Sequence, residues 1–224
     1  YDLLVVGSDT VLNFYDWNLR LQELPIYWIP QSLPSKKVMI SSSIGTDLDI
    51  DSLDQATQQA LRDSIEGFSM LGVRDEITRD FIHDLTPQAS CSVDIIPDPT
   101  FSCAIDGSHS EAYLKTKGVR PDVPIIGLDL PTGLIGVEDA VKYLKSKGYA
   151  VASWRGVSRF ADYDFSDMGP LEWSGIFKRF DITLTNRFHA SIFSLKNLTP
   201  VITMDYKANR ISRSGQSKAS MLMD

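Results

Sequence analysis

Residues that build metal clusters and disulfide scaffolds are scarce in this chain. Its 224 residues include two cysteines, Cys91 and Cys103, and three histidines. The cysteines form no C-x-x-C pair, and the histidines are dispersed along the sequence. A disulfide scaffold and a zinc ribbon are therefore excluded, and no metal site or cofactor is expected. So few cysteines also fit a reducing compartment.

Long apolar runs and an excess of positive charge are missing as well. Runs such as Leu3–Val6 are far shorter than the roughly 18 residues of a membrane-spanning helix. Acidic residues outnumber basic ones by 29 to 22, whereas nucleic-acid-binding surfaces are basic. No signal-peptide pattern is visible at Tyr1, which is not a methionine. We therefore expect a cytoplasmic protein that binds no nucleic acid, represented by a chain trimmed from a longer one.

Short apolar runs alternate with amphipathic segments along most of the sequence. Met70–Val73 and Ile125–Leu130 have the pattern of buried strands. Leu53–Phe68 and Val137–Lys147 repeat their apolar residues near the helical period of about 3.6. Strands that alternate with helices predict an α/β fold with parallel sheets.

A stretch rich in proline, Pro97–Pro124, interrupts this alternation. It is polar, and we predict only a short helix inside it, near residues 110–117. The alternation resumes after Pro124. The sequence therefore predicts two Rossmann-like lobes, an N-terminal lobe over residues 1–103 and a C-terminal lobe over residues 104–224. Both ends look like cuts through a larger fold.

The strongest candidate site follows a predicted strand that ends at Leu184. Thr185 or Asn186 can cap the next helix, which places Arg187 and His189 in its first turn. A helix N-terminus carries roughly half a positive charge, so two basic side chains there are unfavourable unless an anion binds. The pattern therefore predicts an anion site. An exposed arginine and a histidine packed under a loop are the structural alternative.

Three other junctions give weaker signals. Gly7, Ser8 and Asp9 follow the first strand, where a glycine lets a ligand approach the backbone. Ser43 belongs to a serine-rich rim that can hydrogen-bond hydroxyl groups, and Arg74 precedes a predicted helix. Each junction also has a plain structural explanation: an N-cap, a capped loop or a surface ion pair.

Seven short segments, taken in order, resemble one known family. They are Tyr1–Asn13, Val38–Gly45, Gly72–Glu76, Asp98–Phe101, Glu172–Trp173, Thr185–Ala190 and Pro200–Ile202. In this order they resemble the polysaccharide pyruvyl transferase family, over nearly the whole chain. Many members have Gly-Ser-Asp-Gln-x-Trp where this chain has Gly-Ser-Asp-Thr-Val-Leu. That departure affects the acceptor contacts at residues 10–12.

The resemblance implies two lobes like those of the GT-B glycosyltransferases. It also implies transfer of pyruvate from phosphoenolpyruvate onto two hydroxyls of a sugar, which leaves a ketal. Phosphoenolpyruvate would be the donor, and a sugar or glycan the acceptor. The enzyme would have no transmembrane segment and would work beside a glycan-assembly complex.

The same resemblance distributes the candidate residues between donor and acceptor. Arg187 and His189 occupy the family's Arg-x-His positions for donor binding, and we add Asn186 and Arg74 as donor-binding candidates. Gly7–Asp9 would lie on the acceptor side, together with Ser43. An arginine can clamp a carboxylate or phosphate bidentately. Histidine, with an ordinary pKa of about 6.5, suits proton transfer, so His189 is the expected catalytic residue.

Two other classes of function stay open at this point. In a GT-B glycosyltransferase that uses a nucleotide sugar, the same arginine and histidine would hold a diphosphate. A non-catalytic binding domain of a glycan pathway would keep the fold without the chemistry.

Overall fold

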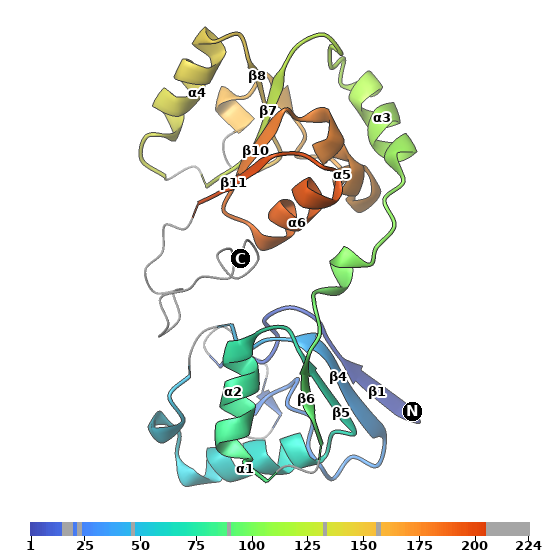
Figure 1. The fold of residues 1–224 in the computed structure, drawn as a ribbon, viewed down its shortest axis with the longest axis vertical. Coiled ribbons are helices and arrows are strands. Elements are labelled where there is room, and N and C mark those ends of the chain that lie inside the picture. The colour runs from blue at the N-terminus through green and yellow to red at the C-terminus, as the bar shows by residue number, and fades with distance from the viewer. Residues whose placement is uncertain are drawn as a thin grey trace. The chain divides into compact units, whose positions relative to one another are not determined.

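The structure is a computed structural model that describes residues 1–14, 20–21, 24–45, 48–88, 91–131, 134–155 and 158–204. Within these residues the chain divides into two compact units, Tyr1–Pro99 and residues 100–204 (Figure 1). Residues 205–224, which belong to the predicted C-terminal lobe, lie outside the described residues.

A four-stranded parallel sheet forms the centre of the first unit. Its strand order is β1-β4-β5-β6, so successive strands are added on the same side. The strands are β1 (Leu3–Val6), β4 (Lys36–Ser42), β5 (Met70–Val73) and β6 (Val93–Ile95). The smaller elements are an antiparallel pair, β2 (Arg20–Leu21) with β3 (Leu24–Pro25), and the 3-10 turn η1 (Ile50–Ser52).

Two helices pack on this sheet, and their ends follow from capping residues. In α1 (Gln55–Glu66), the N-cap Asp54 accepts a hydrogen bond from the Thr57 N–H. In α2 (Glu76–Leu85), the N-cap Asp75 accepts one from the Thr78 N–H. These carboxylates satisfy N–H groups that have no partner within the helix. The buried faces of both helices join Met39 and Leu71 of the strands in one apolar core.

The second unit is built on a five-stranded sheet in which every strand pair is parallel. Its order is β11-β10-β7-β8-β9. The strands are β7 (Ile125–Asp129), β8 (Ala150–Ser153), β9 (Tyr163–Asp164), β10 (Ile182–Thr185) and β11 (Val201–Thr203). The helices are α3 (Gly107–Thr116), α4 (Val137–Ser146), α5 (Pro170–Ile176) and α6 (Phe188–Lys196). The 3-10 turns η3 (Ser158–Phe160) and η4 (Phe177–Arg179) also belong to this unit, and η2 (Pro99–Phe101) spans the division between the two units in the sequence.

Helices cover both faces of this second sheet (Figure 1). An aliphatic core that includes Val137 and Val141 of α4 lies on one face. An aromatic core lies on the other, where Trp154 stacks on Phe180 with ring centroids 5.7 Å apart. From β7 the chain runs outward to β8 and β9, and then returns past β7 to form β10 and β11. The order of the strands therefore reverses between β7 and β10.

The predicted α/β class with parallel sheets is confirmed, and the differences concern the ends of elements. α1 begins at Gln55 instead of Leu53, because Leu53 closes η1 and Asp54 is the N-cap. The pattern of residues 171–180 predicts one helix, whereas α5 ends at Ile176 and the chain continues as η4. The pair β2–β3 and strand β9 were missed, since two-residue strands are too short to show a period of two.

Candidate functional site

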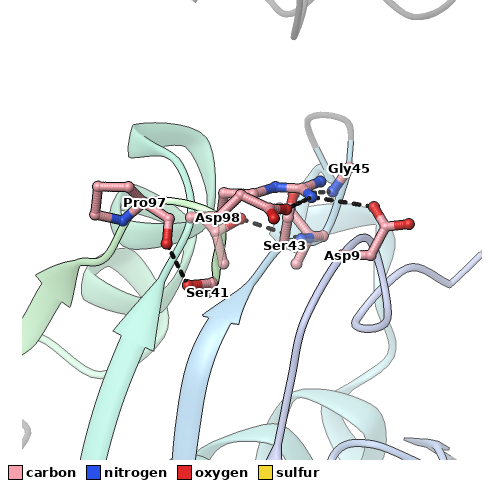
Figure 2. A network of polar contacts seen from close by, with 9 residues as sticks. Asp9, Ser41, Ser43, Gly45, Pro97 and Asp98 are labelled. Atoms are coloured by element: carbon pink, nitrogen blue, oxygen red, sulfur yellow. Dashed lines mark hydrogen bonds and ion pairs between the residues drawn. The ribbon is translucent and has the colours of Figure 1, made fainter. Parts of the chain in front are cut away.

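In the first unit, polar residues gather where the four parallel strands end (Figure 2). Asp9 follows β1, Ser43 follows β4, Arg74 follows β5 and Asp98 follows β6. Nη1 of Arg74 lies 3.1 Å from Oδ1 of Asp9 and 3.1 Å from Oδ2 of Asp98. One guanidinium therefore joins two carboxylates from opposite edges of the sheet.

The two ion pairs of this network differ in their exposure to solvent. The side chain of Arg74 is 6% exposed and that of Asp98 only 1%, whereas that of Asp9 is 56% exposed. Arg74 and Asp98 thus form a buried pair, and Asp9 is the group that faces solvent. Two carboxylates pair with the single guanidinium of Arg74, so no positive charge is left over at this position. Through these contacts Arg74 links the loops that follow β1 and β6.

Backbone hydrogen bonds also tie the predicted junctions of this unit together. The Ser43 N–H donates to the Asp9 carbonyl at 3.0 Å, and the Arg74 N–H donates to the Ser42 carbonyl at 3.0 Å. The Ser41 hydroxyl donates to the carbonyl of Pro97 at 2.7 Å, as Figure 2 shows. Hydrogen bonds therefore connect the ends of β1, β4 and β5 and the residues after β6 into one network.

Gly7 and Ser43 have local structural roles in this surface. A Cβ at Gly7 would lie 2.3 Å from the carbonyl oxygen of Ile40, so the close approach of β1 and β4 requires glycine here. Ser43 is fully buried, and its hydroxyl accepts a hydrogen bond from the Gly45 N–H at 2.9 Å. Ser8 lies beside them and is partly buried. Sugar binding by Gly7, Ser8 and Ser43 remains a prediction.

In the second unit, the predicted anion junction lies between β10 and α6. Arg187 is the N-cap residue of α6, instead of lying in its first turn, and His189 is the second helical residue. The predicted cap, Thr185 or Asn186, is therefore wrong. Thr185 is the last residue of β10, and its hydroxyl accepts a hydrogen bond from the N–H of the N-cap residue Arg187 at 2.9 Å. Arg187 is exposed, and Asn186 and His189 are partly buried. The His189 ring meets the ring of Phe188 edge to face, 5.6 Å away.

The first turn of α6 contains no acidic residue. Four backbone N–H groups at a helix start have no partner within the helix, and their dipoles favour negative charge. In α6 the positive end of the helix dipole therefore lies beside the exposed guanidinium of Arg187. Such an arrangement favours an anion.

Sequence reasoning missed a buried carboxylate beside this junction. Asp129 ends β7 directly opposite Thr185, and its side chain is only 2% exposed. Its Oδ2 lies 3.3 Å from the Thr185 hydroxyl, and its Oδ1 lies 3.7 Å from Nε of Arg155. Burial raises the pKa of the Asp129 carboxyl, while the positive charges of Arg155 and Arg187 oppose that rise.

Two signals in the sequence could have revealed this group. Asp129 is a charged residue inside an otherwise apolar strand, which is uncommon unless the charge has a partner. Arg155 comes two residues after the end of β8, the next strand. It therefore lies at the carboxyl ends of the strands, as Arg187 does after β10. A search of every strand end for charged residues would have found both.

Other kinds of site find no support in the described part of the chain. No three histidine, cysteine, aspartate or glutamate side chains lie together as metal ligands among the described residues. None of the described helices is long and apolar enough to cross a bilayer.

Comparison with known proteins adds one match. The model of a family described as polysaccharide pyruvyl transferase matches residues 1–208 of the 224. This segment includes the network around Arg74 as well as the junction at Arg187. No curated protein matches the chain.

Proposed function

The chain belongs to the polysaccharide pyruvyl transferase family, and we propose that it moves pyruvate from phosphoenolpyruvate onto two hydroxyls of a sugar. The observation that carries this proposal is the exposed Arg187 at the start of α6, where no acidic residue occupies the first turn. Phosphoenolpyruvate carries a phosphate and a carboxylate, and either anion suits this position.

The proposed reaction is balanced in bonds and protons. The methylene carbon of phosphoenolpyruvate takes up a proton, and one sugar hydroxyl oxygen bonds to the neighbouring carbon. A second hydroxyl oxygen then bonds to the same carbon, and the bond between this carbon and the phosphate oxygen breaks. Of the two hydroxyl protons released, one balances the proton taken up by the methylene carbon, and the other leaves with phosphate.

In this proposal the side chains of the second unit serve the donor. Arg187 clamps an anionic group of phosphoenolpyruvate with its two-pronged guanidinium, and Asn186 assists. His189 transfers the proton, because imidazole gains and loses protons near neutral pH. Arg74 stays a donor-binding candidate, although the contacts described for it are those of a structural ion pair.

The first unit would serve the acceptor. Asp9 presents a carboxylate that is 56% exposed, and carboxylates accept hydrogen bonds from sugar hydroxyls. Gly7 and Ser8 would line the same surface, and Ser43, which is fully buried, would support the loop beneath it as an acceptor-side candidate. The proposal assigns residues 1–103 to an acceptor lobe and residues 104–224 to a donor lobe, in a fold of the GT-B type. The reaction would take place in the cytoplasm.

A ligand comparison tests the proposal against the two alternatives. Thermal unfolding is followed with phosphoenolpyruvate, with UDP-glucose and with inorganic phosphate, each in separate titrations, because a ligand that binds the native state raises the unfolding temperature. We expect the largest rise with phosphoenolpyruvate. A larger rise with UDP-glucose would favour a nucleotide-sugar glycosyltransferase, and no rise with any of them would favour a non-catalytic domain.

A further inference from the structure

The strand order of the second unit marks one point of its sheet as a binding position. The chain leaves β7 toward β8 and returns on the other side to form β10, so the order reverses between β7 and β10. In open α/β sheets, ligands bind outside the carboxyl ends of the strands at such a reversal. Asp129 and Thr185, the last residues of β7 and β10, lie opposite each other there.

Two arginines flank this position, one from each neighbouring strand. Arg155 follows β8 and Arg187 follows β10, and both strands border β7. The guanidinium of Arg155 lies 3.7 Å from Asp129, and the charge of Arg187 also acts on this carboxyl. The strands β8 and β10 are about 10 Å apart, twice the usual strand spacing, so two arginine side chains leaning over β7 can hold one small molecule.

Neither arginine has its hydrogen-bonding capacity filled within the described residues. No described side chain or carbonyl accepts a hydrogen bond from the guanidinium of Arg155 or from that of Arg187, although each has five N–H donors. Both reach solvent: the side chain of Arg155 is 41% exposed, and Arg187 is exposed. Asp129 is buried beneath them, and its Oδ1 accepts no hydrogen bond from any described residue.

The charges at this position leave room for an anion. Two arginines face one carboxylate, so one positive charge is left over. The contrast with Arg74 is direct, because that guanidinium is buried between two carboxylates. Arg74 has two carboxylates to itself, whereas Arg155 shares its one carboxylate, Asp129, with Arg187.

We propose that Arg155 binds the carboxylate of phosphoenolpyruvate, while Arg187 and the N-terminus of α6 bind its phosphate. Asp129 holds the two arginines over the end of β7 before the donor arrives and is a positioning residue. The assignment follows from charge and position: the positive end of the α6 dipole, with Arg187 beside it, suits the more highly charged phosphate, and the planar fork of Arg155 suits a planar carboxylate. This inference rests on the proposed function, and it adds Arg155 to Arg187 as a second residue that binds the donor.

The test compares two ligands that differ in one anionic group. Dissociation constants of phosphoenolpyruvate and inorganic phosphate are measured by calorimetry on the intact protein and on Arg155→Gln, Arg187→Gln and Arg120→Gln. Arg120 is exposed, pairs with Asp122 and precedes β7, so it is a matched arginine at the opposite end of the strands.

We expect Arg155→Gln to weaken phosphoenolpyruvate binding about 10-fold or more, the loss of one charge-assisted hydrogen-bonding pair. Phosphate binding should stay within about twofold in that variant. Arg187→Gln should weaken both ligands, and Arg120→Gln neither. Arg155→Lys keeps the charge and loses the planar fork, so its affinity for phosphoenolpyruvate should lie between those of the wild type and Arg155→Gln. If the glutamine variant does not fold, the lysine variant supplies the test.

The two proposals fail in different ways. If the unaltered protein binds phosphate but gains nothing from the enolpyruvyl carboxylate, the pyruvyl-transfer proposal is wrong. If it prefers phosphoenolpyruvate and Arg155→Gln keeps that preference, the donor assignment stands and Arg155 has no part in it. An equal loss of phosphate and phosphoenolpyruvate affinity in Arg155→Gln would also overturn the carboxylate assignment.

Discussion

Arg74 and Asp98 form a buried ion pair at the ends of β5 and β6, with Nη1 and Oδ2 3.1 Å apart. The same guanidinium also holds Asp9 at 3.1 Å, where the carboxylate is largely in solvent. One arginine therefore takes part in two ion pairs of equal length in different surroundings. Stability measurements can separate the effect of burial from that of distance.

Asp98→Asn should lower the free energy of unfolding by about 3 kcal/mol, because it removes the buried charge that balances Arg74. Asp9→Asn should lower it by about 1 kcal/mol or less, since solvent screens an exposed pair. Asparagine suits position 9, where φ is 81° and few other side chains are tolerated. Urea unfolding of both variants measures the difference. Equal losses would mean that burial does not strengthen the Arg74–Asp98 pair.

Gly7→Ala should destabilise the first unit by about 1–3 kcal/mol, because the new Cβ would collide with the backbone oxygen of Ile40. Gly107→Ala is the matched control. It begins α3, has no heavy atom within 4 Å of the added Cβ, and should be neutral or stabilising by about 1 kcal/mol at most. Thermal unfolding of the two variants is the measurement, and a tolerated alanine at position 7 would contradict the predicted collision.

Arg187→Lys should weaken phosphoenolpyruvate binding about 10-fold while the unfolding temperature stays the same. The charge is kept and the planar fork is lost, and an exposed side chain contributes little to stability. Calorimetric titration gives the affinity. Unchanged affinity would show that Arg187 acts as a simple point charge or not at all.

His189→Ala should reduce turnover about 10²- to 10⁴-fold at saturating phosphoenolpyruvate, the usual effect of removing a general acid or base. The fold should persist, because His189 is only partly buried in the first turn of α6. Phosphate release in the presence of the acceptor sugar measures turnover. Should the variant need more donor but turn over normally once saturated, His189 is a binding residue only.

Asp129→Asn should change how stability depends on pH. Burial raises the pKa of this carboxyl above its ordinary value of 3.8, so the native state holds the proton more tightly than the unfolded chain. The stability from this group is present at low pH and is lost as pH rises through the native pKa. The free energy of unfolding of the variant, minus that of the wild type, should therefore increase as pH rises above the ordinary carboxyl pKa of 3.8. Denaturant unfolding at several pH values measures it, and a difference that falls with pH would mean that the arginines outweigh burial.

The sequence was most informative where one local pattern determines one element. Met70–Val73 was predicted as a strand and is one, because a short apolar run between turn residues has few alternatives. A helix after the strand of residues 181–184 was likewise predicted, although α6 begins at Phe188, after the N-cap Arg187, and not directly after Thr185 or Asn186.

Partnerships between distant residues could not be predicted. Nothing local links Asp129 to Thr185, or Arg74 to Asp98, since their proximity depends on which strands become neighbours. The room needed at Gly7 depends in the same way on Ile40 of another strand. Sequence reasoning thus placed Arg187 and His189 at a strand-to-helix junction and gave no sign of Asp129 on the neighbouring strand.

The parallel pairing of β7 with β10 also has a consequence for how the protein forms during synthesis. Asp129 and Thr185 are 56 residues apart, and β8 and β9 are made between them. Such distant pairings close slowly, because the chain loses much entropy before the contact forms. The carboxylate between the two arginines therefore stays without its strand partner until β10 has left the ribosome. The proposed donor position forms only when most of the second unit has been translated, so nascent chains that stop before β10 should fail to retain phosphoenolpyruvate.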